Sequence, residues 1–299
     1  MAGRAAQALR RRRRVRPILQ AEVGAIGLRH SALPGFGLSL GFATAYLGLI
    51  VLLPLAGLLA KAGTMDAARA WAVLSDPRTV SAFRVSFLTS AAAALLSIPL
   101  GVLLAWVLER YHVPGRRLLD AAIDLPFALP TAVAGIALTT LYVADGWLGR
   151  WLDPFGITVA FTPLGIGAAL LFIGVPFVVR TVQPVLAGVD RAAEEAAMVL
   201  GATPVQIFGR VILPTLAPSI ATGAALAFAR AVGEYGSVIF IAGNRPGVSE
   251  IVPLLIVIKL EQFDYPGAAL LGAAMLALSL VLLLAINGLQ NLGRPRGAA

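Results

Sequence analysis

The chain has 299 residues, 59% of them hydrophobic and 13% charged, with a mean hydropathy of +0.86 and a net charge of +9. This composition excludes a soluble globular domain of any size and predicts an all-α integral membrane protein. Cysteine is absent, which excludes disulfides, thiolate nucleophiles and cysteine metal sites.

The chain begins with a basic segment. Residues 1–34 hold eight of the 24 basic residues, and Arg10–Arg14 are consecutive. Beside a membrane span such a run is most often a disordered tail that sets topology, although it could also bind nucleic acid or anionic lipid. The apolar run 38–60 that follows has 23 residues, more than the hydrophobic core of a signal peptide. We therefore predict a disordered cytoplasmic tail followed by a first membrane span.

Apolar windows with little charge predict six membrane spans, because a helix needs about 20 apolar residues to cross about 30 Å of hydrocarbon. With six spans, both termini lie on one side. The loops on that side, both tails and Arg180 hold 16 arginines, whereas the opposite loops hold seven basic residues. This bias places both termini in the cytoplasm. The predicted transmembrane domain is 35–290, with a second tail at 291–299 and spans near 38–60, 84–108, 122–144, 163–184, 216–242 and 266–289.

Two further features refine these spans. The segment 251–258, IVPLLIVI, is apolar but too short to cross, so we expect a buried or interfacial segment packed against the spans. Prolines recur in the third and fourth spans, which predicts bent helices there. These prolines are Pro126, Pro130, Pro163, Pro176 and Pro184.

A polar stretch, 190–214, separates the fourth and fifth spans. Asp190 predicts an N-cap, and the two glutamates that follow lie near the positive end of the helix dipole. Gly201 predicts the end of the helix 191–200, since glycine enters the left-handed conformation without steric cost. Thr203-Pro204 predicts the start of a second helix, and Pro214 its end. The result is a helical hairpin suited to a groove on a partner, the alternative being a helical loop with no such role.

One motif in this stretch supports docking. Glu195-Ala196-Ala197, three residues, Gly201, nine residues and then Val211-Ile212-Leu213-Pro214 resembles the EAA loop of ABC-importer permeases. In that family the loop is the coupling helix, which lies in a cleft of the ATPase subunit. Val211 stands where the pattern has isoleucine, a change that keeps a β-branched apolar side chain. The resemblance implies ATPase coupling by Glu194, Glu195, Ala196, Ala197, Gly201, Leu213 and Pro214.

The fifth predicted span carries charge. Arg230 and Glu234 are one helical turn apart, and Arg230 lies near mid-membrane. A lone arginine there costs at least ~2.5–3.5 kcal/mol, so the pair must face protein or water. Either the pair is structural, or Arg230 attracts an oxyanion while Glu234 keeps it from being held too tightly. Small residues recur every four positions, which allows a close helix approach: Ala221, Ala225, Ala229, Gly233 and Ser237. The candidate translocation path is Arg230, Glu234 and Ser237.

Longer stretches of the sequence resemble one narrower family of permeases. The runs 227–244 (AFARAVGEYGSVIFIAGN) and 249–268 (SEIVPLLIVIKLEQFDYPGA), with LPFALPTAVAG at 125–135, are similar to the membrane permease of the bacterial sulfate/thiosulfate importer. Within that importer, the stretch KLEQFDY resembles the T-subunit type of permease. The similarity, over about 38–290, implies a type I ABC importer fold in the bacterial inner membrane. It also implies a second permease, two copies of an ATPase that holds ATP and Mg, and a periplasmic sulfate-binding protein.

Other functions stay open or are excluded. Molybdate permeases carry an ARALGE-like run, so a molybdate or tungstate permease is an alternative, and a membrane-embedded enzyme or assembly protein is a remote one. Lys61 and Lys259 lie in no phosphate-binding loop, so we expect ATP hydrolysis on a separate subunit. Gly37–Gly41 spells G-x-S-x-G but opens a membrane helix. We expect no catalytic residue, no metal site, no cofactor on this chain and no nucleic-acid partner.

Overall fold

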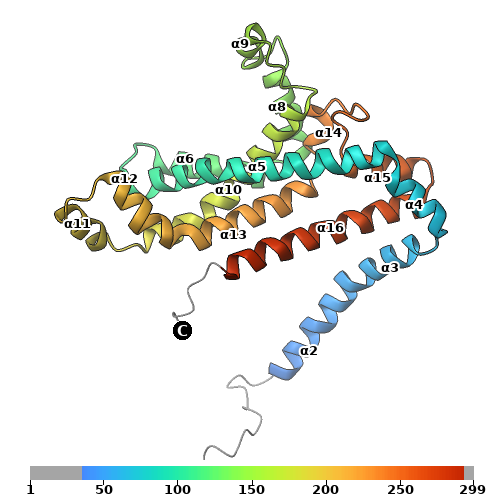
Figure 1. The fold of residues 1–299 in the computed structure, drawn as a ribbon, viewed down its shortest axis with the longest axis horizontal. Helices are drawn as coiled ribbons and strands as arrows, with labels where there is room; N and C mark the ends of the chain where they lie inside the picture. Colours follow the sequence, from blue (N-terminus) through green and yellow to red (C-terminus); the bar gives the residue numbers. More distant parts are fainter. Residues whose placement is uncertain (1–35, 293–299) are drawn as a thin grey trace, which may run out of the picture. The chain divides into compact units, whose positions relative to one another are not determined.

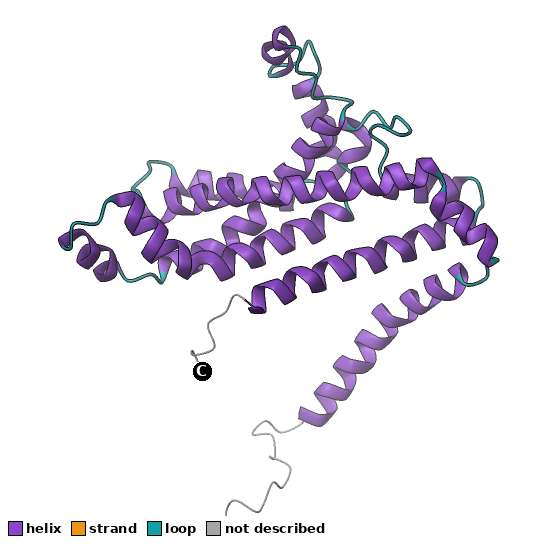
Figure 2. Cartoon of the chain, viewed as in Figure 1, coloured by secondary structure: helices purple, strands orange, loops and turns teal. Residues whose placement is uncertain are grey.

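The structure, a computed structural model, describes residues 36–292. The predicted basic tail 1–34 lies outside the described residues, as do residues 293–299 of the second predicted tail. Across the described range the chain forms helices joined by loops and contains no strand (Figure 2). The all-α prediction is confirmed.

The chain divides into two compact units, Met1–Ala56 and Gly57–Ala299. In the first unit the described residues form helix α2 (Phe36–Leu47), a π-helical turn η1 (Gly48–Leu52) and the start of α3 (Leu53–Ala62). Together Phe36–Ala62 is an apolar helix of 27 residues, long enough to cross a membrane. It coincides with the first predicted span.

Long helices form the core of the second unit. Helices α5 (Pro77–Arg110), α10 (Pro163–Ala187) and α13 (Leu213–Val232) pack side by side, and α16 (Tyr265–Leu292) lies along α13 (Figure 1). Lipid is as apolar as their side chains, so close van der Waals packing is what holds such helices together in a membrane. The largest buried cluster joins α5, α10 and α13 through Leu108, Val178, Val182, Leu186 and Leu216.

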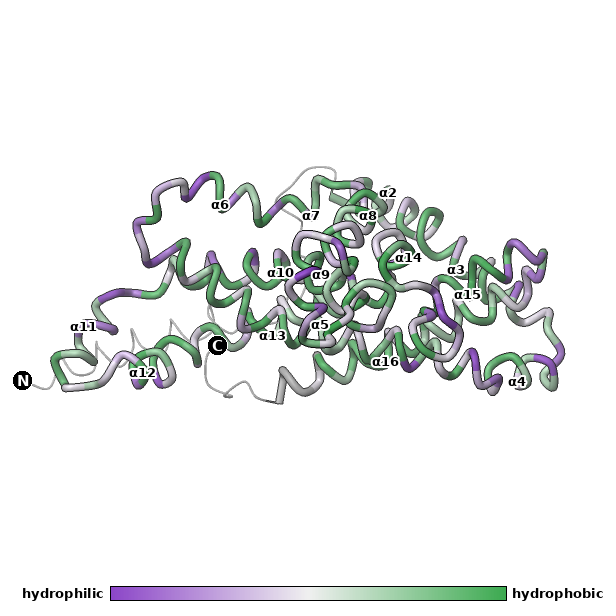
Figure 3. The backbone as a smooth tube through the Cα atoms, turned by 90° about the horizontal axis from the view of Figure 1, so that it is seen from above, coloured by the Kyte–Doolittle hydropathy of each residue, from purple (hydrophilic) through white to green (hydrophobic). Residues whose placement is uncertain are grey.

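Shorter helices gather at the two ends of this bundle. One end holds α6 (Arg116–Ile123), α11 (Arg191–Val199) and α12 (Pro204–Ile207), and the other holds α4 (Ala67–Ser75) and α15 (Val252–Glu261). Hydrophilic stretches mark α6, α11 and α4 when the chain is coloured by hydropathy (Figure 3). The two segments that the sequence assigns to one side of the membrane, 109–121 and 190–214, therefore lie at the same end of the bundle.

Helix α15 corresponds to the apolar segment 251–258. Its residues Val252 and Leu255 are buried against Ala82 and Leu271. The N–H of Val252 donates to the buried Ser86 Oγ at 2.9 Å, which satisfies a donor that the first turn of a helix leaves unpaired. The segment is thus a packed half-helix, in agreement with the buried alternative expected from its length.

Residues 122–144 do not form the single helix that hydropathy predicts. Leu129, which precedes Pro130, is extended (φ −82°, ψ 135°), because the proline ring disfavours a helical residue before it. Pro126 and Pro130 also lack the N–H that a continuous helix needs. The segment is divided among α6, α7 (Leu125–Ala128) and α8 (Thr131–Tyr142), and the 12-residue α8 is too short to cross a membrane as a regular helix.

The described residues therefore contain five helices long and apolar enough to span a membrane, where the sequence predicts six. The fifth predicted span, 216–242, is also shorter than expected. Helix α13 ends at Val232, and a separate short helix, α14 (Val238–Ile241), follows an unwound segment. The five long helices are Phe36–Ala62, Pro77–Arg110, Pro163–Ala187, Pro204–Val232 and Tyr265–Ile286.

Asp264 fixes the turn between α15 and α16. Its carboxylate accepts from Lys259 Nζ at 3.0 Å and from the Gly267 N–H at 3.1 Å, and Arg69 lies 3.4 Å away. Burial alone would raise the pKa of Asp264, but the hydrogen bond from Lys259, the bond from Gly267 and the two cations outweigh it. The pKa is therefore lower than the ordinary 3.8.

This pKa predicts a pH-dependent contribution to stability. A carboxyl whose pKa is lowered by folding stabilises the fold above its unfolded pKa and loses that contribution as pH falls through the folded pKa. We expect Asp264→Asn to lower the melting temperature at pH 7 and the difference from wild type to shrink as pH falls through the lowered pKa of Asp264. Thermal unfolding in detergent across this range measures it. An equal difference at pH 7 and pH 3 would contradict the assignment.

Candidate functional site

The hairpin between α10 and α13 is built from local signals. Asp190 caps α11, with its Oδ1 accepting the N–H of Ala192 at 2.9 Å. Gly201 has φ +81° and follows the last turn, where its N–H donates to the Met198 carbonyl at 2.9 Å. Both features agree with the sequence prediction. A left-handed residue at this position reverses the chain directly after the helix, so the hairpin geometry depends on Gly201.

The second half of the hairpin differs from its prediction. Thr203 and Gln206 form a reciprocal capping box, and Pro204 opens α12, as expected. Pro214 does not end this helix, however, because Pro204–Val232 runs as one helix of 29 residues. A π-helical turn, η3 (Phe208–Ile212), shifts the hydrogen-bond register just before Pro214, with the Leu213 N–H donating to the Phe208 carbonyl. Pro214 thereby falls where its missing N–H is tolerated.

The tip of the hairpin is apolar and exposed. We call four residues, each between 57% and 87% exposed, the hairpin tip: Met198, Val199, Leu200 and Val205. Glu195 and Ala196 of the EAA motif are exposed beside it. Contiguous large apolar residues on a surface mark an interaction site. The arrangement can therefore dock into an apolar cleft of a partner.

Other motif residues face the chain itself. Glu194 pairs with Arg110 at the end of α5, and both side chains are largely buried. Arg110 also lies over the Trp106 ring, 5.9 Å from its centroid, and Trp106 meets Phe208 edge to face. Ala197 packs against the buried cluster of α5, α10 and α13. Glu194 and Ala197 thus hold the hairpin on the bundle, while Leu213 and Pro214 lie exposed on α13.

The structure brings Arg230, Glu234 and Ser237 together at the end of α13. Glu234 is only 3% exposed. Its Oε2 accepts from Arg230, and its Oε1 accepts both the N–H of Ser237 at 3.0 Å and the Ser237 hydroxyl at 3.1 Å. The sequence predicts that Arg230 and Glu234 lie one turn apart on a continuous helix. Because α13 ends at Val232, they instead form a contact across the end of the helix.

Glu234 also explains why the helix stops there. Its carboxylate replaces the helical acceptor for the Ser237 N–H, so the chain can unwind over residues 233–237 without leaving a buried donor unpaired. Helix α8 packs directly on the unwound segment. A Cβ at Gly135 would lie 2.4 Å from the Ser237 carbonyl oxygen, so only glycine fits at this contact. Gly233 and Ser237 therefore do not continue the small-residue face of α13.

Arg230 has unused hydrogen-bonding capacity. Its side chain is 39% exposed, and its bond to Glu234 is the one polar contact it makes with the described residues. A guanidinium has five N–H donors in a planar fork that suits oxyanions. The remaining donors make no hydrogen bond to the described residues, and the buried Glu234 carboxylate offsets the arginine charge. Within residues 36–292 no three His, Cys, Asp or Glu side chains gather to hold a metal ion.

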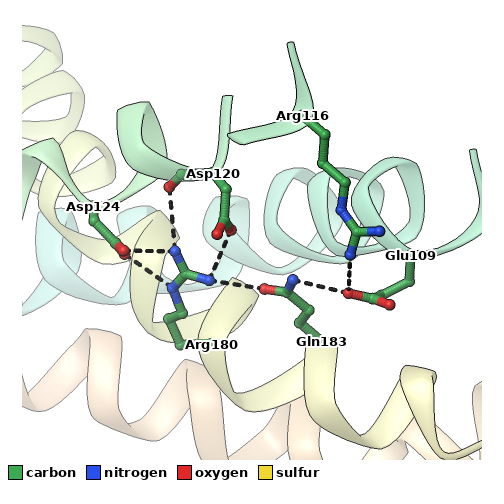
Figure 4. A network of polar contacts seen from close by, with 6 residues as sticks. All are labelled: Glu109, Arg116, Asp120, Asp124, Arg180 and Gln183. Atoms are coloured by element: carbon green, nitrogen blue, oxygen red, sulfur yellow. Dashed lines mark hydrogen bonds and ion pairs between the residues drawn. The ribbon is translucent and has the colours of Figure 1, made fainter. Parts of the chain in front are cut away.

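A polar network that the sequence did not indicate lies at the hairpin end of the bundle (Figure 4). Arg180 of α10 donates to Asp124 through two nitrogens, at 2.9 and 2.6 Å, and to Asp120 at 2.9 Å. It also contacts Gln183, which donates to Glu109. These bonds join α10 to the segment between α5 and α7. A pair of aspartates four residues apart, opposite one arginine in an apolar span, was the only available signal.

We expect this network to stabilise the fold. Arg180→Met would leave Asp120 and Asp124 without their cation, and we expect a loss of about 1–3 kcal/mol, because the groups are only partly buried. The measurement is the thermal unfolding midpoint of the purified protein. Arg117→Gln, which removes an exposed cation with no ion pair among the described residues, is the matched control. Equal midpoints for both variants would show that the network contributes nothing.

Comparison with known proteins gives consistent matches. Residues 97–296 match the family model for the binding-protein-dependent transport system inner membrane component. The chain is 52% identical to the sulfate transport system permease protein CysT of Synechocystis sp. over 249 residues, 83% of this chain and 87% of that protein. Its identity to CysT of Escherichia coli K12 is 49% over 259 residues, 87% of this chain and 94% of that protein.

Solved structures share the fold. One is a bacterial ABC transporter involved in the import of the acidic polysaccharide alginate, with a TM-score of 0.69, 16% identity, and coverage of 83% of this chain and 92% of that chain. A second is the alginate transporter in complex with its pentasaccharide-bound periplasmic protein, with a TM-score of 0.68 and 20% identity, covering 84% of this chain and 92% of that chain. At these identities the likeness establishes the architecture of an ABC importer permease and nothing of the substrate.

Proposed function

The chain belongs to the family of binding-protein-dependent transport system inner membrane components, and on that basis we propose that it carries sulfate, and thiosulfate, through the membrane for an ATP-driven importer. The observation that carries the proposal is identity near one half to sulfate permeases over more than four fifths of both chains. Identity and coverage this high support a common architecture and a common role as a sulfate permease subunit. The chain is a multi-pass membrane protein and a transport subunit.

Coupling to ATP is assigned to the hairpin. The hairpin tip supplies an apolar knob, and Glu195 and Ala196 lie exposed beside it. Arg110 and Glu194 connect this surface to α5, so a movement of the docked partner would reach the long helices. We assign ATP and Mg to a separate ATPase present in two copies. Closure of those subunits on ATP would then shift the permease between inward-open and outward-open states.

The anion path is assigned to the unwound end of α13. Sulfate is a dianion, and Arg230 offers it free donors while the buried Glu234 already offsets the arginine charge. A site of this kind binds an anion weakly enough to release it, which a carrier requires. Glu234 and Ser237 hold Arg230 and the unwound backbone in place. Arg230 is the residue that would touch the anion.

The proposed complex contains further subunits. A heterodimer with a second sulfate permease would complete the path, and a periplasmic sulfate-binding protein would deliver the anion. The alginate transporter structure described with its periplasmic protein supports the last point as an architecture. We place the chain in the bacterial inner membrane, surrounded by lipid and with both termini in the cytoplasm, because basic residues concentrate on the hairpin side.

The orientation predicts where a periplasmic reporter works. A reporter active only in the periplasm should be silent when fused at Arg116 or Thr203 and active at Asp76, Asp153 or Arg245. The structure places α6 and α12 at one end of the bundle and α4 at the other, which supports this division. Opposite activity at Arg116 and Thr203 would be incompatible with the proposed topology.

Substrate identity is tested by competition. In cells that depend on this permease for sulfate uptake, excess unlabelled sulfate or thiosulfate should suppress uptake of labelled sulfate, and equimolar molybdate should not. Co-purification of an ATPase and a second permease with the tagged chain tests the assembly. Stronger competition by molybdate or tungstate would assign the chain to that substrate instead.

A further inference from the structure

A cavity of about 510 Å³ lies beside the hairpin, away from Arg230. We call it the arginine pocket, and its wall combines the end of α5, the following turn and the first residues of α6 and α11. The wall includes Glu109, Arg110, Tyr111, His112, Arg116 and Arg191. Three arginines thus face one cavity of a size typical of small-ligand sites.

The described residues do not neutralise all the cations of this pocket. Arg116 pairs with Glu109 at 2.9 Å (Figure 4), and Arg110 pairs with Glu194. Arg191 is exposed and has no hydrogen bond or ion pair with any described residue. Glu109 is further shared with Gln183. The pocket wall therefore carries an excess of positive charge.

Two features show that this charge is held at a cost. Arg116 and Arg191 are each the first residue of their helices, where the positive end of the helix dipole disfavours a cation. Arg110 is 89% buried at its side chain, and its Nε is buried without an acceptor. A buried unpaired donor is rare in proteins and is satisfied by a ligand, ion or water. An oxyanion in the pocket would offset the charge of the three arginines that line it.

The location of the pocket specifies its surroundings. Helix α5 carries no charged residue over 85–108 and turns polar at Glu109, so the pocket lies where the span leaves the hydrocarbon. Tyr111 and Trp106 flank this level, as aromatic residues do at membrane interfaces. Basic pockets between spans on the cytoplasmic side are suited to lipid headgroup phosphates.

We propose that the arginine pocket binds a tetrahedral oxyanion of the phosphate or sulfate class, presented by an anionic lipid headgroup or free in the cytoplasm. The cytoplasmic assignment rests on the proposed orientation. Arg110 ties α5 to Glu194 of the hairpin, so an anion bound here would fix the coupling surface relative to the bundle. The site is distinct from the transport path and is occupied by an anion that is not carried.

Binding, and not uptake, tests this proposal, so its failure is separable from failure of the transport function. The assembled complex carries Arg230→Gln, so that anion binding at the proposed path does not contribute to the measured binding. In neutral detergent at constant ionic strength, inorganic phosphate and sulfate are titrated and the unfolding midpoint is followed. In a second arm the complex is placed in phosphatidylcholine nanodiscs with or without phosphatidylglycerol, and native mass spectrometry counts the retained phosphatidylglycerol.

The variants share one background, and each replaces arginine with glutamine. We expect Arg116→Gln with Arg191→Gln to weaken binding at least about tenfold in one arm, because each guanidinium contributes charge-assisted hydrogen bonds. Arg191→Gln alone, which breaks no ion pair or hydrogen bond among residues 36–292, should weaken it measurably. Arg117→Gln, adjacent but outside the pocket, should leave it unchanged. A response in the first arm identifies a free anion, and one in the second identifies lipid.

Three outcomes would contradict anion binding by the arginine pocket. No saturable binding in either arm would overturn the proposal. So would binding that all three variants weaken equally, since that is general surface charge. Loss of the ATPase subunit from the double variant with anion binding unchanged would show that these arginines dock the ATPase instead.

Discussion

Arg230→Gln should reduce sulfate uptake by at least about 100-fold while the complex still assembles, because it removes charge-assisted hydrogen bonds to a dianion. The double variant Arg230→Gln with Glu234→Gln should remain equally inactive. A glutamine at 234 can still accept from Ser237, so the double variant should keep the unwound segment folded. The measurements are initial uptake rates and the yield of assembled complex.

A purely structural role for the pair predicts the reverse. The single variant would leave the buried Glu234 carboxylate without its cation and lose stability, and the double variant would recover both folding and transport. Glu234→Ala is the contrasting variant, because it leaves the Ser237 N–H without an acceptor and should reduce assembly itself. A double variant that transports at the wild-type rate would show that Arg230 and Glu234 form a packing contact and not a path.

Gly201→Asp should uncouple ATP hydrolysis from import while the protein stays in the membrane. A Cβ at Gly201 would meet no atom within 4 Å, so the cost is conformational: a side chain at φ +81°. A left-handed residue costs about 1–2 kcal/mol, with Asn and Asp the most tolerant. Asp adds a negative charge at the negative end of the α11 dipole. The effect on coupling should therefore increase with the strain that each side chain brings.

A series at this position sharpens the test. Gly201→Asn should couple nearly as well as wild type, Gly201→Asp less well, and the β-branched Gly201→Val worst, with at least about a fivefold drop in sulfate moved per ATP hydrolysed. The ratio is measured on reconstituted complex, and expression level is the control. A wild-type ratio in Gly201→Val would mean that the turn does not set the docking geometry.

Local signals in the sequence predicted the hairpin well. Asp190, Gly201 and Thr203 act through bonds to residues two or three positions away, so their roles are visible without the fold. The effect of Pro214 depends on a π-helical turn that precedes it, and no residue type announces such a turn. The expected helix end was therefore wrong at this proline.

The limits of hydropathy appear in the third and fifth predicted spans. An apolar window counts side chains, whereas the break at Leu129 follows from a backbone constraint imposed by Pro130. The break after Val232 depends on a buried carboxylate that accepts a main-chain N–H. Residues 234 and 237 are spaced as neighbours on a continuous helix would be. Only the fold therefore reveals that the helix is interrupted.

Long-range pairs were out of reach for a different reason. Arg180 meets Asp120 and Asp124 across 60 and 56 residues. Arg110 meets Glu194 across 84. In the sequence, Arg180 entered only the count of basic residues and Glu194 only the EAA motif. A single chain offers no means of pairing them before the helices are placed.

The most direct test of sulfate import is uptake by the purified complex in proteoliposomes. With ATP inside and the sulfate-binding protein outside, we expect labelled sulfate to accumulate only when ATP is hydrolysed, with unlabelled molybdate in equal amount having little effect. Omission of this chain should abolish accumulation. Sulfate accumulation without this chain, or no accumulation when every subunit and ATP are present, would contradict its assignment as a sulfate permease.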